Sequence, residues 1–244
     1  MNTWDYITIN LKRKKLHCSL LDPDRQKMDI PKLRLVIERL HSYGTDLIFI
    51  GGSSNIDSGF VDEFILTIKN TTDIPVIIFP GGLSSISRHA DAILFMSLLN
   101  SLDPLWLSWV QAKSAPLIKK AGIETIGTGY IVIDPGMKVG EVGHAKLIAR
   151  DDEASASQFA LTAQYFGMKL VFLDAGSGSP CHVPVDMIRA VKSTIDLPLI
   201  VGGGIRTPEA AKSVVAAGAD IIVTGTQIEE DVSRIKSIIT AIKA

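Results

Sequence analysis

Apolar segments of strand length recur along the whole chain, and longer stretches with helical spacing of apolar residues separate them. The segments with strand character are Leu16–Asp22, Asp46–Gly51, Pro75–Phe79, Asp91–Ser97, Thr125–Ile133, Lys169–Asp174, Pro198–Val201 and Asp220–Thr224. Their apolar residues are continuous rather than alternating, which is typical of strands that are buried on both faces, as in a parallel sheet.

Helical periodicity predicts helices over Pro31–Tyr43, Asp57–Asn70, Pro104–Ala121, Asp152–Phe166, Pro184–Thr194, Pro208–Ala217 and Glu229–Lys243. Four of these stretches begin with a proline, which suits the first turn of a helix. Strands that alternate with helices indicate an α/β fold, here a (β/α)8 TIM barrel. Because no linker or change in composition divides the chain, we expect one domain over residues 1–244.

One helix of the expected ring has no counterpart in the sequence. The third and fourth strands are separated only by Pro80–Ala90, PGGLSSISRHA, which contains two glycines and three serines. The segment is compatible with a short helical turn inside a loop. It is equally compatible with a gap in the helical ring that exposes an apolar groove.

The overall charge and the cysteines narrow the classes of partner. The formal net charge is −1, which disfavours nucleic acid as a ligand. Cys18 and Cys181 lack metal-binding or redox spacing, so we expect a reduced, cytoplasmic protein. No apolar run approaches the ~20 residues that span a bilayer. Transient, peripheral contact with a membrane remains compatible with this composition.

Three glycine-bearing turns, at 171–178, 198–206 and 220–227, follow the last three predicted strands. The chemistry of a TIM barrel lies at the carboxyl ends of its strands, and bare backbone N–H groups there can bind phosphate. The residues that would present N–H groups or hydroxyls are Ser177, Gly178, Gly203, Gly204, Gly225 and Thr226. Ordinary turn formation is the alternative explanation for these glycines.

Three polar side chains at strand ends are candidates for further chemistry. Asp22 ends the first strand, and a single carboxylate suits Mg²⁺, which completes its shell with water and ligand phosphates. Ser53, after the second strand, could add a hydroxyl beside the same ion. Asp174 ends the sixth strand beside the first glycine turn, where it could deprotonate a substrate hydroxyl. Capping of the adjacent turns is the competing role for each residue.

Several motifs, in one order, closely resemble the geranylgeranylglyceryl phosphate synthase family over about residues 16–230. They are LLDPD (20–24), GGSS (51–54), FMSLLNS (95–101), GTGYIVIDPG (127–136), KVGEVGHAKLI (138–148), FLDAGSG (172–178) and VGGGIR (201–206). GGGIR alone is weak, because many phosphate-binding barrels carry it. The resemblance implies a barrel that lacks its third helix, in agreement with the short 80–90 segment.

The resemblance also implies an activity: transfer of a polyprenyl group, here geranylgeranyl, from its diphosphate to the C3 hydroxyl of sn-glycerol 1-phosphate, which makes the first ether bond of archaeal membrane lipids. Asp22 and Ser53 would hold Mg²⁺, and Asp174 would act as the base. The glycerol phosphate site would comprise Phe172, Leu173, Asp174, Ala175, Gly176, Ser177, Gly178, Gly203, Gly204, Gly225 and Thr226.

Two positions depart from the family pattern. Relatives usually have Tyr-Leu-Glu where this chain has Phe172-Leu173-Asp174, so a hydroxyl is absent and the carboxylate is one methylene shorter. Many relatives have an aromatic residue, which helps to pack larger assemblies, where this chain has Glu141. We expect a homo-oligomer, with a dimer and a hexamer both open.

Three alternatives remain at this point. The nearest is the same reaction with another prenyl chain length, as in bacterial heptaprenyl relatives. A phosphosugar isomerase or an indole-forming barrel would share the glycine turns, but it would need an acid/base pair across the mouth and no Mg²⁺. The third is a barrel that binds phosphate without catalysis.

Overall fold

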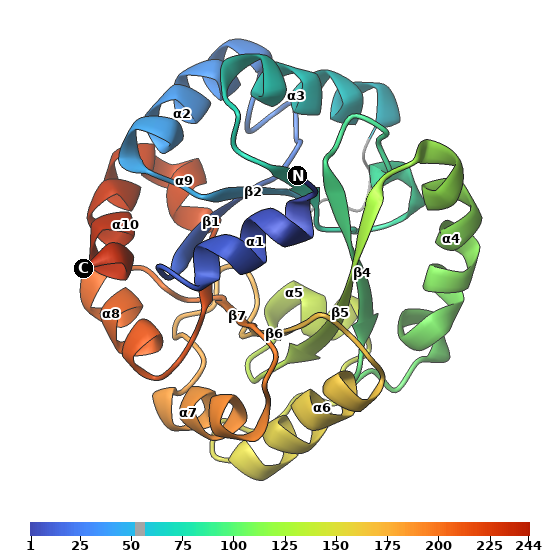
Figure 1. Cartoon of the computed structure of the whole chain (residues 1–244), viewed down its shortest axis with the longest axis vertical. Coiled ribbons are helices and arrows are strands. Elements are labelled where there is room, and N and C mark those ends of the chain that lie inside the picture. Colours follow the sequence, from blue (N-terminus) through green and yellow to red (C-terminus); the bar gives the residue numbers. More distant parts are fainter. Residues whose placement is uncertain (52–56) are drawn as a thin grey trace.

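Eight parallel strands form a closed barrel in the order β1 to β8 (Figure 1). The computed structural model describes residues 1–51 and 57–244. The strands are β1 Leu16–Leu21, β2 Leu47–Ile50, β3 Val76–Ile78, β4 Ala92–Leu98, β5 Glu124–Val132, β6 Leu170–Asp174, β7 Leu199–Gly202 and β8 Ile221–Thr224. The predicted fold class is therefore confirmed, and the strand boundaries differ from the predicted ones by a few residues at most.

The continuous apolar character of the strands has the expected cause, because each strand is covered on both sides. Along β6, Leu170 and Phe172 belong to the core inside the barrel. Val171 and Leu173 belong to the core between the barrel and the helices. The period of two along a strand then directs Asp174, like Phe172, toward the barrel axis.

The helices around the barrel agree in place with the predicted ones. They are α2 Ile30–Tyr43, α3 Ser58–Thr71, α4 Val110–Ala121, α6 Glu153–Tyr165, α7 Val185–Thr194, α8 Pro208–Ala216 and α10 Ile235–Lys243. Their amino termini are capped by side chains such as Asp29, Asp152 and Thr207, each of which accepts a backbone N–H of the first turn. Within residues 1–51 and 57–244, no helix combines the length and apolar character that crossing a bilayer requires.

Two predicted helices differ in detail from the observed ones. The stretch predicted over 104–121 begins with the π-helical turn η2, Leu105–Trp109, and becomes α-helical only at α4. The last predicted helix is divided into α9 Thr226–Asp231, the 3-10 turn η3 Val232–Arg234 and α10. The side chain of Asp231 accepts the backbone N–H of Ser233, which starts a new turn at this point.

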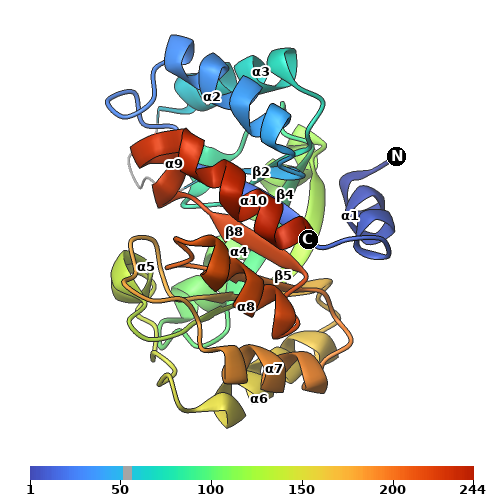
Figure 2. The ribbon, with the colours of Figure 1, turned by 90° about the vertical axis from the view of Figure 1, so that its left-hand side faces the viewer.

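A helix that the sequence pattern did not predict, α1 Thr3–Leu11, closes the amino-terminal end of the barrel (Figures 1 and 2). Ile7 is buried in the barrel interior, and Trp4 packs against the same core. The Glu124 carboxylate of β5 accepts the backbone N–H groups of Thr3 at 2.6 Å and Trp4 at 3.2 Å. Figure 2 places α1 on the side of the barrel opposite to α5 Met137–Val142 and α9, so α1 does not cover the carboxyl ends of the strands.

The third helix of the ring is absent from the connection between β3 and β4. Residues 79–91, all of which the structure describes, contain only the 3-10 turn η1, Leu83–Ser85. β4 therefore has α4 beside it, and a loop with one short turn takes the place of the helix between β3 and β4. The structure agrees with both predictions for this segment. It contains a short helical turn, and the ring of helices is interrupted there.

Candidate functional site

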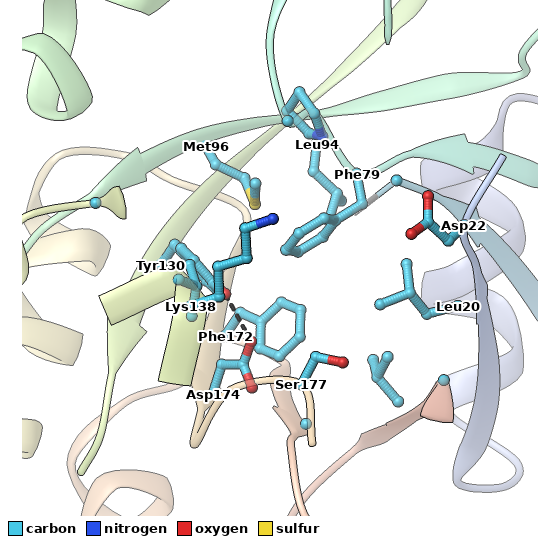
Figure 3. Close-up of a pocket in the computed structure, with 18 of the residues that line it drawn as sticks. Leu20, Asp22, Phe79, Leu94, Met96, Tyr130, Lys138, Phe172, Asp174 and Ser177 are labelled. Atoms are coloured by element: carbon cyan, nitrogen blue, oxygen red, sulfur yellow. Dashed lines mark hydrogen bonds between the residues drawn. The ribbon is translucent and has the colours of Figure 1, made fainter. Parts of the chain in front are cut away.

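A cavity of about 590 Å³ opens at the carboxyl ends of the strands (Figure 3). Its lining has two parts of different chemistry. One part consists of the glycine turns after β6, β7 and β8, together with Asp174. The other part includes Asp22, apolar side chains from β1, β4 and α4, and Phe79, which directly follows β3. Polar recognition and apolar burial therefore meet in a single cavity.

Asp174 lies at the bottom of the polar part and is almost fully buried, with 8% of its surface exposed. Its Oδ2 accepts the hydroxyl of Tyr130 at 2.6 Å, and its Oδ1 accepts the backbone N–H of Gly176 at 2.7 Å. Burial raises the pKa of Asp174, and the two hydrogen bonds oppose that rise because they stabilise the ionised form. The arrangement holds a carboxylate in a fixed orientation where it can accept one further proton.

Tyr130, in β5, was not among the predicted site residues. Burial, and then the charge of Asp174, raises its pKa well above the ordinary value, so the hydroxyl keeps its proton and donates. Tyr130 stands in the middle of an apolar strand, and the sequence gives no sign that its hydroxyl reaches β6.

The glycine turns carry the predicted phosphate ligands to one side of the mouth. Ser177, Gly178, Gly203, Gly204, Gly225 and Thr226 all line the cavity. The hydroxyls of Ser177 and Thr226, from two different turns, lie 3.4 Å apart. Arg206, which also lines the cavity, donates to the carbonyl of Gly178 at 3.0 Å and adds a cation that sequence analysis had not singled out. The turns thus converge on a place that suits an anion.

Two of these glycines cannot be replaced without a rearrangement of the site. Gly203 has a φ of 80°, and a Cβ there would lie 2.8 Å from Oδ1 of Asp174. Gly204 has a φ of 69°, and a Cβ there would lie 2.3 Å from the carbonyl of Cys181. Both the left-handed conformation and the close approach of the backbone require glycine.

Three residues of the predicted glycerol phosphate site lie away from the cavity lining. Leu173 and Ala175 are fully buried in the core between the barrel and the helices, because they alternate with Phe172 and Asp174 along the strand. Gly176 is buried, and its N–H is bonded to Asp174. These three residues therefore shape the strand and the carboxylate rather than line the cavity.

Asp22 lines the opposite side of the mouth, at the end of β1. Its Oδ2 lies 3.4 Å from Nζ of Lys27, which also lines the cavity. Ser53, its predicted partner, lies outside the described residues. Within the described part of the chain, no group of three or more His, Cys, Asp or Glu side chains could hold a metal. One carboxylate suits Mg²⁺ that is bound mainly by water and ligand phosphates, and a Mg²⁺ site at Asp22 stays a prediction.

An apolar groove continues from the cavity to the outside of the barrel. Leu94 and Met96 line it from the inner face of β4, and Ile93 and Phe95 line it from the outer face. Across the groove lie the side chains of α4 and η2, namely Trp106, Val110, Ser114 and Ile118. The groove occupies the place where the missing helix would pack, so an elongated apolar ligand can extend there from the mouth.

Comparisons with known proteins agree with this arrangement. The sequence profile of the PcrB family matches residues 9–243. The chain is 50% identical over 226 residues to a geranylgeranylglyceryl phosphate synthase of Pyrococcus horikoshii, covering 92% of this chain and 88% of that protein.

Among solved structures, the chain is similar to (S)-3-O-geranylgeranylglyceryl phosphate synthase from Thermoplasma acidophilum in complex with its substrate sn-glycerol-1-phosphate. The TM-score is 0.95 at 47% identity, over 100% of this chain and 99% of that one. The N-acetylmannosamine-6-phosphate 2-epimerase from Clostridium perfringens matches with a TM-score of 0.58 at 15% identity, over 94% of this chain and 96% of that one. The second likeness shows the barrel fold alone.

Proposed function

This chain belongs to the PcrB family, and on that premise we propose that it joins sn-glycerol 1-phosphate to geranylgeranyl diphosphate through an ether bond. The observation that carries the proposal is the single cavity in which a phosphate-binding set of turns and a buried carboxylate adjoin an apolar groove. A phosphorylated polyol fits the first part, and a long prenyl chain fits the second. The relatives named geranylgeranylglyceryl phosphate synthase support the same substrates.

The residues of the polar part have separate roles in binding and in proton transfer. The turns with Ser177, Gly203 and Thr226 bind the phosphate of glycerol 1-phosphate, which directs its C3 hydroxyl toward Asp174. The oxygen of that hydroxyl forms a bond to C1 of the prenyl group, while the C1–O bond to diphosphate breaks and diphosphate leaves with the electron pair. Asp174 takes the hydroxyl proton. Fixing both reactants removes an entropic cost of ~7–11 kcal/mol.

Mg²⁺ is the metal that this donor set fits, with Asp22 as its protein ligand, and Ser53 stays a predicted second ligand. When bound, it supplies charge that stabilises the leaving diphosphate. Lys27, beside Asp22, contributes a further positive charge on the same side of the mouth. Asp22 and Lys27 therefore form the diphosphate side of the site.

The alternatives differ in what they require of the cavity. The substrate of a phosphosugar isomerase is small and polar, so it would not occupy an apolar groove that continues past β4. A barrel without catalysis has no use for a buried carboxylate held by Tyr130 and Gly176. A longer prenyl chain, as in heptaprenyl transfer, uses the same polar half and differs only in how much of the groove it fills.

The test is an assay of the purified protein with labelled sn-glycerol 1-phosphate, Mg²⁺ and prenyl diphosphates of ten to thirty-five carbons. The proposal expects a prenyl ether of glycerol phosphate, with the highest kcat/KM for the twenty-carbon donor. A preference for the thirty-five-carbon donor would instead indicate that the protein catalyses heptaprenyl transfer. Absence of any ether product, with the phosphate site still able to bind glycerol phosphate, would contradict it.

Release of the product and assembly complete the proposal. Exposed apolar side chains, among them Leu102, Leu105, Trp109 and Val142, belong to segments beside the groove. We propose that they permit transient contact with a membrane, which co-sedimentation with anionic vesicles tests.

We also propose that the protein is a homo-oligomer. Glu141 is exposed on α5, so light scattering of the wild type and of Glu141→Trp distinguishes a dimer from a hexamer.

A further inference from the structure

Phe79 is an aromatic residue of the cavity that has no role in the proposed reaction as described above. It follows β3 directly and is half-buried, and its side chain lines the cavity. Tyr130 and Phe172 contact its ring in T-shaped arrangements, with centroids 5.7 Å and 5.9 Å away. The buried ring of Phe49 lies nearly parallel to it, at 22° and 6.4 Å. Because its neighbours hold it on several sides, the ring is fixed, and its remaining side faces the cavity.

The backbone also fixes the position of Phe79. Its N–H donates to the carbonyl of Ile50 at 2.8 Å. Gly51 approaches so closely that a Cβ there would lie 2.0 Å from the carbonyl oxygen of Phe79. The ring therefore keeps its place without any ligand.

Figure 3 shows the ring of Phe79 in the centre of the pocket, between Asp22 on one side and Asp174 on the other. In the proposed function, the diphosphate lies on the side of Asp22, and the attacking hydroxyl lies on the side of Asp174. C1 of the prenyl group, which loses the diphosphate oxygen and gains the hydroxyl oxygen, has to lie between these two groups. That place is beside the ring of Phe79.

As the C1–O bond to diphosphate breaks, positive charge develops on the allylic carbons of the prenyl group. The face of an aromatic ring attracts a cation, and the attraction grows when water is excluded. Leu20, Leu94 and Met96 surround this part of the cavity with apolar atoms. They also keep water from capturing the cation, which would yield a free prenyl alcohol instead of the ether.

We propose that Phe79 is a catalytic residue whose ring stabilises the allylic cation during prenyl transfer. The inference rests on the proposed function, which supplies the two oxygens between which the cation forms. Phe172 and Tyr130 are positioning residues in this account, because they hold the ring of Phe79 in place. A neutral ring suits the role, since a carboxylate at the same place would capture the cation as an ester.

The test is the replacement of Phe79 by phenylalanines with one, two and three ring fluorines. Fluorine withdraws electron density from the ring face and changes its size little, while it makes the ring more apolar. We expect kcat to fall stepwise with each fluorine, to about a tenth or a thirtieth of the original value at three fluorines, because a desolvated cation–π contact contributes about such a factor. The affinity for glycerol 1-phosphate should stay constant. The same series at Phe64, which is fully buried in α3, is the matched control and should leave kcat unchanged.

A flat series at Phe79, in a protein whose wild type makes the ether, would overturn the role of the ring and leave the proposed function intact. A wild type that makes no ether would overturn both. Phe79→Leu gives a second measure that does not depend on fluorine: it should lower kcat and raise the share of free prenyl alcohol among the products. An unchanged product ratio together with unchanged kcat would contradict the proposal.

Discussion

The two halves of the mouth recognise their ligands by different means. On the side of β6, β7 and β8, recognition depends on backbone: glycines such as Gly203 and Gly204 adopt left-handed conformations and bring N–H groups to one place. On the side of β1 to β4, recognition depends on apolar side chains and on the charged side chains of Asp22 and Lys27. A compact phosphate suits a fixed backbone site, whereas a flexible prenyl chain suits an extended apolar surface. One barrel can therefore accommodate both ligands when a helix of its ring is absent.

The largest effect is expected where the two halves meet, at Asp174. Asp174→Asn keeps the shape of the side chain and removes the base, so we expect kcat to fall by about 10²–10⁴-fold. Affinity for glycerol 1-phosphate, measured by calorimetry, should change little. Asp186→Asn, at an exposed carboxylate of α7 that pairs with Arg189, is the control. Turnover close to that of the wild type would exclude Asp174 as the base.

A smaller but still large effect is expected on the diphosphate side. Asp22→Ala removes the proposed ligand of Mg²⁺, so kcat/KM for the prenyl diphosphate should fall by about 10²–10³-fold. The dependence of the rate on Mg²⁺ concentration should shift to higher concentration. Asp73→Ala, at an exposed residue of the opposite end, controls for loss of charge. If glycerol phosphate affinity fell to the same extent, the separation of the two halves would be wrong.

A change in the groove should alter the choice of prenyl chain without touching phosphate recognition. Ser114 is 8% exposed and lines the groove from α4. Ser114→Phe would occlude the space of about two CH₂ groups, each of which contributes ~0.8 kcal/mol when buried, so kcat/KM for the twenty-carbon donor should fall about 15-fold. The fifteen-carbon donor should be affected less. Competition between the two donors in one assay measures this preference directly.

The smallest effect concerns the pH dependence of the base. Tyr130→Phe removes a hydrogen bond that stabilises the ionised form of Asp174, so the pKa of Asp174 should rise further. The base must be ionised to act, and activity is lost as pH falls through its pKa. The acid limb of the kcat profile should therefore move to higher pH, with a loss of about tenfold near that limb. A pH profile that keeps its acid limb while kcat falls would assign Tyr130 a purely structural role.

The same difference between the halves explains what could be predicted from sequence. The phosphate turns were predictable because a backbone site requires glycine, and glycine is visible in the sequence. The barrel was predictable because strands covered on both faces are continuously apolar. Phe79 could not be predicted, because an apolar residue at a strand end resembles any core residue until its neighbours in space are known. Tyr130 was missed for the same reason, since its partner is 44 residues away.

The helices that were missed also have physical causes. α1 has apolar residues at helical spacing, at Trp4, Ile7 and Leu11, and Asn2 caps its amino terminus, but the apolar Tyr6 and Ile9 lie off this stripe and obscure the helical pattern. α5 is six residues long and contains Gly140, which lowers helix propensity. Side chains alternate along β6, so Leu173 and Ala175 face the helices rather than the cavity. The turn motif alone did not show this.

The separation of the two halves is tested most directly by a crossed binding experiment. Ser177→Asp places a negative charge at an exposed position of the phosphate turns, and Ser114→Phe fills the groove. The dissociation constants of glycerol 1-phosphate and of a non-reactive geranylgeranyl thiodiphosphate are measured for both variants and the wild type. We expect Ser177→Asp to weaken the binding of glycerol 1-phosphate alone, by about tenfold or more, and Ser114→Phe to weaken the binding of the prenyl ligand alone. Equal weakening of both ligands in either variant would contradict this separation.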